Sequence, residues 1–431
     1  MICNNITVKD NTLYFAGQNT VELAKKYGTP LYLMDEDKIR EKCRIYKHAF
    51  VKHFGPGSYP LYASKANSFK RIYEIMTEEG MGIDVVSSGE IYTALKAGFD
   101  ISNAYFHSNN KTDEDIRYAI ENGIGYFVAD NVEEVKAVEA ESARKGIVQK
   151  LLLRITPGID THTYEAVNTG MVDSKFGSAI ETGQAAEIVA FTLQQNHVEL
   201  VGFHCHVGSQ VFAEDVFERA AVVMLEFIAD MREQFGYTAK VLDLGGGYGV
   251  RYVDSDPYLD IETKIGEVAA TIRVTCDRLG LEMPAIHMEP GRSIVADAGM
   301  TLYTVGTVKQ IPGYKNYVSI DGGMTDNPRF ALYGSKYTCF VANKMNETCD
   351  FECSIVGRCC ESGDIIQEHV KVPASVGRND IVAVCTTGAY NYSMASNYNR
   401  VARPALVMLS NGDNYVAVRR ESLEDICRND I

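Results

Sequence analysis

The chain has 431 residues, of which 46% are hydrophobic and 23% charged, a composition typical of a globular protein with two or three domains. Its formal net charge of −15 argues against nucleic acid and anionic membrane surfaces as partners, because both attract basic faces. The sequence offers no signal peptide, no apolar run of about 18 residues that would cross a membrane, and no disulfide pattern among its eleven cysteines. We therefore expect a cytoplasmic protein whose thiols stay reduced.

The first predicted elements are two short strands, Ile6–Lys9 and Thr12–Phe15. From about residue 55 to residue 292, short apolar runs then alternate with longer amphipathic stretches. The runs are rich in Val, Ile, Leu, Tyr and Phe and show little polar alternation, which is typical of parallel strands covered on both faces. Eight such runs occur: Pro60–Ser64, Gly82–Val86, Ala104–His107, Tyr126–Ala129, Leu151–Ile155, Val201–His206, Val241–Leu244 and Ala285–Met288.

Most intervals between these runs have helical patterns. Ser88–Ala97 follows a potential N-cap serine, and Thr112–Glu121 begins with a capping threonine. Val216–Gln234 and Ile261–Leu279 have apolar residues at helical spacing. Eight strand–helix units favour a (β/α)8 TIM barrel over residues 32–300, with an open doubly wound sheet as the alternative.

The pattern changes after about residue 300 to short β-type runs separated by turn residues. These runs are Thr301–Ile311, Tyr317–Ile320, Tyr337–Asn343, Phe351–Val356, Ile365–Val372, Ile381–Thr386, Ala405–Leu409 and Tyr415–Arg419. They predict an all-β C-terminal domain over residues 301–431. We expect residues 1–31 to join this domain through their two strands.

A lysine follows the first apolar run of the barrel directly, in Ser64-Lys65-Ala66-Asn67. Active-site residues of such barrels lie at the C-terminal ends of the strands, so Lys65 is a candidate for Schiff-base chemistry. The alternative is a lysine whose ammonium simply reaches solvent.

The sixth run ends in His204 and His206, which strand alternation puts on one face, so that one or both can point into the barrel mouth. Buried structural histidines are the alternative. The adjacent Cys205 could suggest a metal site, but no CxxC pair supports it, and we expect no metal.

The last two strand ends have the pattern of an anion site. Gly245-Gly246-Gly247 follows the seventh run, where phosphate sites commonly form, and glycines let the backbone present N–H groups to a ligand. The eighth run ends in Glu289-Pro290-Gly291-Arg292. An acid beside a phosphate would be repelled unless it faced a cation such as a protonated pyridine nitrogen. Lysine, histidine, phosphate nest and carboxylate together meet the requirements for holding pyridoxal phosphate.

Several segments resemble the fold-type-III pyridoxal-phosphate decarboxylases and, among them, the diaminopimelate decarboxylases. The matching motifs are Tyr62-Ala63-Ser64-Lys65-Ala66-Asn67, Asp173-Ser174-Lys175-Phe176-Gly177, His206-Val207-Gly208-Ser209-Gln210, Gly245-Gly246-Gly247-Tyr248-Gly249, Glu289-Pro290-Gly291-Arg292, Cys360-Glu361-Ser362-Gly363-Asp364 and Gly388-Ala389-Tyr390. They run in family order through nearly the whole chain. The resemblance implies decarboxylation of meso-2,6-diaminopimelate to L-lysine and CO2, the last step of lysine biosynthesis, by a homodimer with shared active sites.

The resemblance also implies roles at the cofactor. Lys65 forms the Schiff base, His206 stacks on the ring, Glu289 pairs with the pyridine nitrogen, and Tyr390 reaches both cofactor and substrate. The residues that it implies around the phosphate are Ser209, Gly245, Gly246, Gly247, Gly291 and Arg292.

The substrate has a distal carboxylate and a distal ammonium that must be recognised. Arg329 is a candidate for the carboxylate, because a guanidinium binds this group in a fork. The resemblance implies that Arg292 and Tyr333 assist, and that Glu361 of a second subunit holds the ammonium. Cys360, expected from the same second subunit, is the predicted general acid that protonates Cα, and its alternative is an inert thiol.

Two segments differ from the sequence motifs that are common in this family. Gly357-Arg358-Cys359 stands where Gly-Pro is common, and Tyr164–Asn168 is looser than usual. Two alternatives therefore remain: a related decarboxylase that acts on another amino acid such as ornithine or arginine, and a non-catalytic regulatory homologue. The predicted distal-end residues argue against the first, and the presence of Lys65, Glu289 and Cys360 argues against the second.

Overall fold

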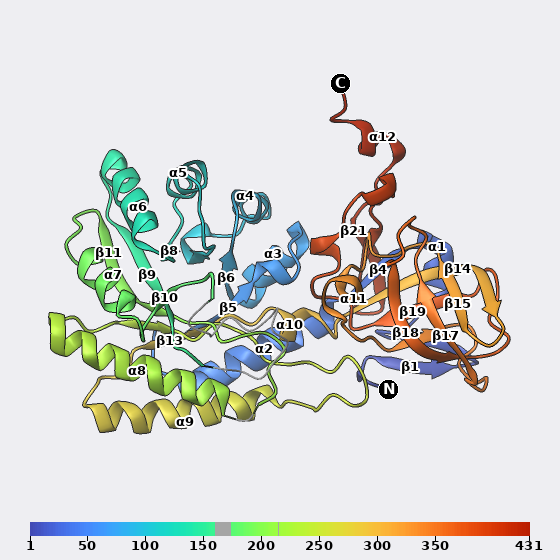
Figure 1. Cartoon of the computed structure of the whole chain (residues 1–431), viewed down its shortest axis with the longest axis horizontal. Helices are drawn as coiled ribbons and strands as arrows, with labels where there is room; N and C mark the ends of the chain where they lie inside the picture. Colours follow the sequence, from blue (N-terminus) through green and yellow to red (C-terminus); the bar gives the residue numbers. More distant parts are fainter. Residues whose placement is uncertain (160–173, 214) are drawn as a thin grey trace. The chain divides into compact units, whose positions relative to one another are not determined.

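The computed structural model describes residues 1–159, 174–213 and 215–431, which form two compact units (Figure 1). The β unit comprises residues 1–41, 250–258 and 294–431, and the barrel unit comprises residues 42–249 and 259–293. The predicted motif residue Asp173 and the segment Tyr164–Asn168 lie outside the described residues.

The barrel unit contains a closed ring of parallel strands. These are β5 Tyr59–Ala63, β6 Gly82–Val85, β7 Ala104–Phe106, β8 Tyr126–Ala129, β9 Gln149–Thr156, β11 Val198–His204, β12 Val241–Asp243 and β13 Ala285–Met288. Pairing of β13 with β5 and of β8 with β9 closes the ring, and the short β10, Ser178–Ala179, pairs with β9. Each ring strand coincides with one of the eight predicted runs, so the predicted (β/α)8 barrel is confirmed.

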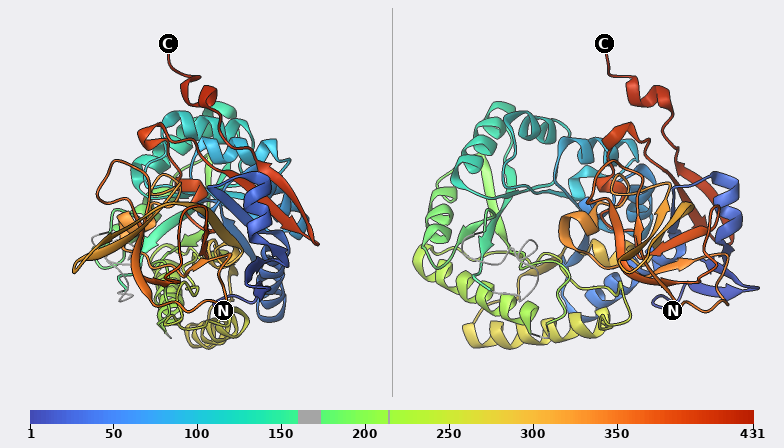
Figure 2. Two further views of the ribbon diagram at one scale, coloured as in Figure 1. Left: turned by 90° about the vertical axis from the view of Figure 1, so that its right-hand side faces the viewer. Right: turned by 45° about the vertical axis from the view of Figure 1, so that its right-hand side comes forward.

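Helices surround this ring of strands (Figure 2). They are α3 Lys70–Glu79, α4 Ser88–Lys96, α5 Asp113–Glu121, α6 Val132–Lys145, α7 Gln184–Thr192, α8 Val216–Phe235 and α9 Ile261–Leu279, while α2 Glu36–His53 contains residues of both units. The predicted caps form: the Ser87 side chain accepts the N–H of Glu90, and Thr112 makes a capping box with Asp115.

The β unit consists of two sheets. β1 Ile6–Lys9, β2 Thr12–Phe15 and β3 Gln18–Asn19 form the smaller sheet. The larger sheet contains β4 Leu31–Asp35, β14 Gly299–Ile311, β15 Lys315–Ile320, β16 Cys339–Val341, β17 Phe351–Val356, β18 Ile365–Val372, β19 Ile381–Cys385, β20 Ala405–Ser410 and β21 Asp413–Val418. Three short helices accompany them: α1 Thr20–Tyr27, α11 Arg329–Tyr333 and α12 Leu423–Cys427. The short α10 Arg292–Val295 contains residues of both units.

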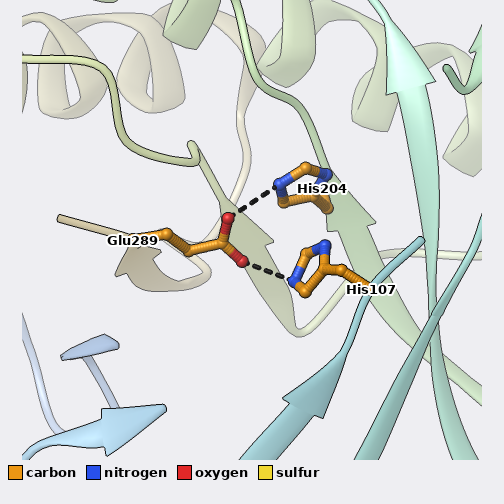
Figure 3. A group of neighbouring side chains, drawn as sticks. All are labelled: His107, His204 and Glu289. Carbon is orange, nitrogen blue, oxygen red and sulfur yellow. Dashed lines mark hydrogen bonds and ion pairs between the residues drawn. The ribbon is translucent and has the colours of Figure 1, made fainter. Parts of the chain in front are cut away.

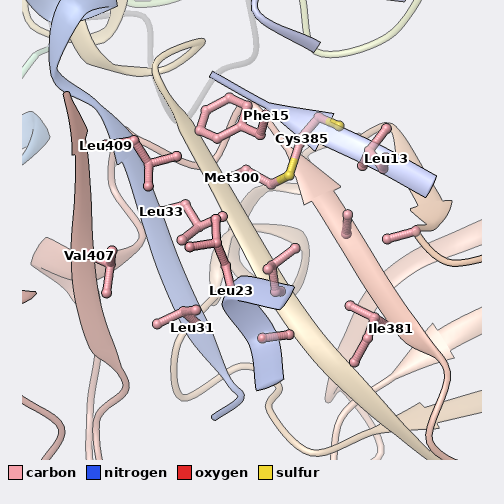
Figure 4. Packing of buried hydrophobic residues seen from close by; sticks show 14 of the residues in the cluster. Leu13, Phe15, Leu23, Leu31, Leu33, Met300, Ile381, Cys385, Val407 and Leu409 are labelled. Carbon is pink, nitrogen blue, oxygen red and sulfur yellow. The ribbon is translucent and has the colours of Figure 1, made fainter. Parts of the chain in front are cut away.

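The N-terminal segment belongs to the core of the β unit. Leu13 and Phe15 of β2 pack in one buried cluster with Leu33 of β4 and Met300 of β14 (Figure 4). The prediction that the N-terminal strands join the β domain is therefore confirmed. β4 falls within the range predicted for the barrel, yet its ladder partners are β14 and β20 of the β unit.

Within the part of the chain that the structure describes, none of the helices combines the length and the apolar composition needed to cross a bilayer.

Candidate active site at the strand ends

Lys65 lies directly after β5, in the 3-10 turn Ser64–Ala66. Its side chain is exposed, whereas both neighbours in the turn are buried. Burial lowers the pKa of His206, and the Lys65 ammonium lowers it further. Burial raises the pKa of Asp84 at the end of β6, and the same ammonium opposes that rise. Lys65 thus lies at the end of the barrel where His206 and Asp84 are found.

Backbone hydrogen bonds tie the loops after β11, β12 and β13 to one another. The N–H of Glu289 donates to the carbonyl of Gly245 at 2.8 Å, and the N–H of Val211 donates to the carbonyl of Gly247 at 2.9 Å. A Cβ on Gly246 would collide with the Glu289 carbonyl oxygen, so only glycine fits between these loops. This close backbone approach explains the predicted run of glycines and suits a backbone nest around an anion.

Arg292 and Ser209 meet beside the glycine loop. The Arg292 side chain is buried, and its Nη2 donates to Ser209 Oγ at 3.0 Å. A Cβ on Gly291 would lie 2.9 Å from the Cβ of Ala63, so this turn packs tightly against the end of β5. A buried guanidinium beside a hydroxyl and a glycine loop makes a positive, donor-rich environment that fits a phosphate.

The Glu289 carboxylate faces two imidazole rings, with one oxygen directed at each (Figure 3). Oε1 of Glu289 is 2.6 Å from Nε2 of His107, and Oε2 is 3.2 Å from Nε2 of His204. His107 follows β7, His204 ends β11, and Glu289 follows β13, so three strands meet at this carboxylate. All three side chains are buried.

These contacts decide the charge on Glu289. Burial alone would raise the pKa of this carboxyl, but His107 and His204 outweigh burial and hold the pKa well below its usual range. Burial lowers the pKa of His204 to about 3, against the opposing effect of Glu289. We therefore assign an ionised Glu289 that accepts a hydrogen bond from a neutral His204.

His206 lies next to the glycine loop and is half-buried. A Cβ on Gly245 would be 2.9 Å from its Nδ1, so the imidazole ring lies against the loop backbone. Since burial and Lys65 lower its pKa well below the usual range, the ring is neutral near pH 7. A neutral flat ring at this position is compatible with the predicted stacking role, which stays a prediction.

The β unit brings three predicted substrate residues together. The Arg329 guanidinium carbon lies 5.1 Å from the ring centroid of Tyr333 and 5.2 Å from that of Tyr390. Arg329 is buried within the first residues of α11, and the two tyrosines are half-buried. Cys360 and Glu361 lie in the turn between β17 and β18, where both are exposed.

One residue of this site, His107, was not predicted as functional. It ends the predicted run Ala104–His107, so a polar side chain at the C-terminal end of a barrel strand was the available signal. His204 was weighed together with His206 as a residue facing the mouth, and the structure places it against Glu289.

Two kinds of group suit this set of residues. His107, His204 and Glu289 have ligand atoms within 4.8 Å of one another, a donor set that a metal ion can use. The wider arrangement fits pyridoxal phosphate better, because it adds an amine at Lys65 and a donor-rich phosphate cradle to an ionised carboxylate that can face a pyridinium.

Comparison with known proteins agrees with this fit. Residues 36–296 match the family model described as the pyridoxal-binding domain of pyridoxal-dependent decarboxylases. The chain is 43% identical to the diaminopimelate decarboxylase of Bacillus subtilis, covering 97% of this chain and 95% of the relative. The chain is 44% identical to the diaminopimelate decarboxylase of Staphylococcus aureus, covering 99% of this chain and 100% of the relative.

A solved structure is similar over the same length. Diaminopimelate decarboxylase of M. jannaschii in complex with L-lysine superimposes with a TM-score of 0.91 at 32% identity, covering 99% of this chain and 98% of that one. Fold, site and near-complete sequence similarity agree. The chain therefore belongs to the diaminopimelate decarboxylase family, whose members are pyridoxal-phosphate-dependent carboxy-lyases.

Proposed function

We propose that this protein decarboxylates meso-2,6-diaminopimelate to L-lysine and CO2. The observation that carries the substrate assignment is the buried Arg329, held between Tyr333 and Tyr390. A rigid guanidinium binds a carboxylate through two parallel hydrogen bonds, and this substrate keeps a distal carboxylate after the reacting one has left. Ornithine and arginine have no distal carboxylate.

The cofactor is proposed to lie at the strand ends of the barrel unit. Bound pyridoxal phosphate supplies an electron sink for bond cleavage at Cα. Lys65 supplies the amine that attaches it, His206 packs against its ring, and Glu289 keeps a proton on the pyridine nitrogen. The phosphate is bound by Ser209, Gly245, Gly246, Gly247, Gly291 and Arg292.

The remaining residues are proposed to handle the substrate. Arg329, with Arg292 and Tyr333, binds the distal carboxylate, and Tyr390 contacts substrate and cofactor. Cys360 delivers a proton to Cα after CO2 has left.

We propose further that Cys360 and Glu361 act in the active site of a second subunit, where Glu361 binds the distal ammonium. Both side chains are exposed in the single chain, which supports this assignment. The homodimer is proposed to work in the cytoplasm, since all eleven cysteines are present as thiols.

The function is tested by incubating the purified protein with pyridoxal phosphate and meso-diaminopimelate and identifying the product by mass spectrometry. L-lysine is the expected product. Lys65→Ala serves as the control and should form none, because the proposed attachment point of the cofactor has been removed. Absence of lysine with the unmodified chain, when the cofactor is bound, would contradict the proposal.

A further inference from the structure

The Glu289 carboxylate has an unusual set of neighbours for a buried acid. Its side chain is 6% exposed, and each of its two oxygens faces a different imidazole nitrogen. The rings of His107 and His204 stand edge to face, with centroids 4.8 Å apart and an interplanar angle of 69°. This packing fixes both rings, and through them the plane of the carboxylate (Figure 3).

We propose that His107 and His204 are positioning residues for Glu289: His204 donates a hydrogen bond to Oε2, His107 lies at ion-pair distance from Oε1, and together they keep this carboxylate ionised and oriented towards the cofactor nitrogen. The inference rests on the proposed function, in which Glu289 pairs with that nitrogen. An ionised carboxylate has about four acceptor positions, and Oε1 has no hydrogen-bond partner among the described residues, so room is left for a contact with the cofactor.

The second nitrogen of His204 supports the donor role. Nδ1 of this ring is buried and has no hydrogen-bond partner among the described residues. A protonated ring would leave a buried N–H without an acceptor there, which is costly. The ring is therefore neutral, with its single proton on Nε2, where it can donate to Glu289.

The other charged and titratable groups around Glu289 explain why donors are needed. Asp84 on β6 and Asp243 on β12 are buried acids whose charges act on the same site, and the pKa of each is raised by burial. Arg154 on β9 is a buried cation that attracts Glu289. The charge of Glu289 also acts on the pKa values of Cys205, His206 and His287. Two acids near a third would favour its protonation, and the two imidazole rings oppose this by lowering the pKa of Glu289.

A metal ion is the competing occupant of the same three side chains. Nε2 of His107 and Oε1 of Glu289 are 2.6 Å apart, a direct ion-pair contact in which neither atom has a well-oriented hydrogen bond. Two ligands about 2.0–2.2 Å from a tetrahedral zinc ion would be spread further apart. The geometry therefore favours a direct contact, and metal content becomes an outcome of the test.

The test compares donor-deleting and donor-retaining variants at each histidine. His107→Phe and His204→Phe remove the N–H, whereas His107→Gln and His204→Gln keep an N–H at similar reach. His287→Phe is the matched control, because His287 is a buried barrel histidine whose Nδ1 lies 3.1 Å from the Tyr105 hydroxyl. The readouts are the visible spectrum of the bound cofactor against pH, without substrate, and the pH profile of kcat.

We expect each phenylalanine variant to move the acid limb of the kcat profile upwards by at least one pH unit. Removing a donor raises the pKa of Glu289, so this carboxylate takes up a proton at a higher pH. The cofactor spectrum should change in the same pH range. In the glutamine variants, the acid limb and the spectral change should return towards their positions in the unmodified protein. His287→Phe should leave the acid limb and the spectral change where they are in the unmodified protein.

An acid limb and a spectrum that do not move in the phenylalanine variants would overturn the inference, as would a pH-independent loss that glutamine does not restore. If phenylalanine prevents folding, His107→Asn and His204→Asn, which are polar but too short to reach Glu289, take its place. A stoichiometric metal ion whose removal by a chelator abolishes the cofactor spectrum would also overturn it. The spectral titration needs no substrate, so an inactive protein with the expected spectral shifts would contradict only the proposed function.

Discussion

At the scale of single residues, the Glu289 carboxylate is the point where the ends of three barrel strands meet. Lys65, Glu289 and Arg292 each follow a predicted strand, so their place at one end of the barrel followed from the pattern of apolar runs. The approach of His107 to Glu289 depends on β7 and β13, which are far apart in the chain and not neighbours in the sheet. The spacing of residues in the sequence does not predict the contact between His107 and Glu289.

The first residue-scale prediction concerns Arg329. Replacing it with lysine should lower kcat/KM for diaminopimelate about tenfold, and replacing it with alanine about a hundredfold, because hydrogen bonds with charged groups contribute roughly 1.5–3 kcal/mol each. Lysine keeps the charge but loses the fork that binds both carboxylate oxygens. Steady-state kinetics would measure the loss. Equal kcat/KM values in the alanine variant and the unmodified protein would show that another residue binds the distal carboxylate.

The second residue-scale prediction separates the two adjacent cysteines. Cys360→Ala should lower kcat by about 10²–10⁴-fold, the usual contribution of a general acid, and leave the cofactor spectrum intact. Cys359→Ala is the matched control and should change kcat little, since burial and Asp364 raise the pKa of that thiol and its N–H is bonded to Asp364 at 2.7 Å. A reversed order of effects would assign the proton donor to Cys359.

At the scale of elements, the strands were predictable because each buried run is short and is bounded by turn residues. The sequence did not indicate that β4 belongs to the β unit. Its five residues are all buried, so its sequence pattern is the same as that of a barrel strand. Its pairing with β14 and β20 is a long-range contact. The helix α1 had local signals, an Asn19 cap and Gly28 after its last residue, but it is only eight residues long.

The element-scale prediction concerns the glycine loop after β12. Gly246→Ala should destabilise the protein by about 1–3 kcal/mol and weaken binding of pyridoxal phosphate, because the added methyl group collides with the Glu289 carbonyl and forces the two loops apart. Chemical denaturation and a cofactor titration would measure the two effects. Gly55→Ala is the control, since a Cβ at Gly55 meets nothing within 4 Å. Similar losses in both variants would argue against a specific role of the close loop contact.

At the scale of the whole molecule, the sequence predicted two domains and the placement of the N-terminal strands. The units that the structure defines change at residues 41/42 and 293/294, and residues 250–258 belong to the β unit. That last segment follows the glycine loop and has no strand or helix of its own. Its grouping depends on contacts such as the hydrogen bond from the Thr338 hydroxyl to the Tyr252 carbonyl, which no local pattern can indicate.

The whole-molecule prediction concerns the shared active site. Alone, Lys65→Ala should be inactive and Cys360→Ala should keep at most about a hundredth of the unmodified activity. An equal mixture that exchanges subunits should regain about a quarter of the unmodified activity. Half of the dimers then contain both variants, and one of their two sites is intact. Light scattering would confirm the dimer. An exchanged mixture that stays inactive would place Lys65 and Cys360 of one chain in the same site.

The central claim, that the active site selects an amino acid with a distal carboxylate, is tested most directly by comparing CO2 release from meso-diaminopimelate, ornithine, arginine and lysine. We predict a kcat/KM for diaminopimelate at least about a hundredfold above that of the others, because they leave the buried Arg329 without its partner. An equal or higher kcat/KM for ornithine, arginine or lysine would contradict the claim.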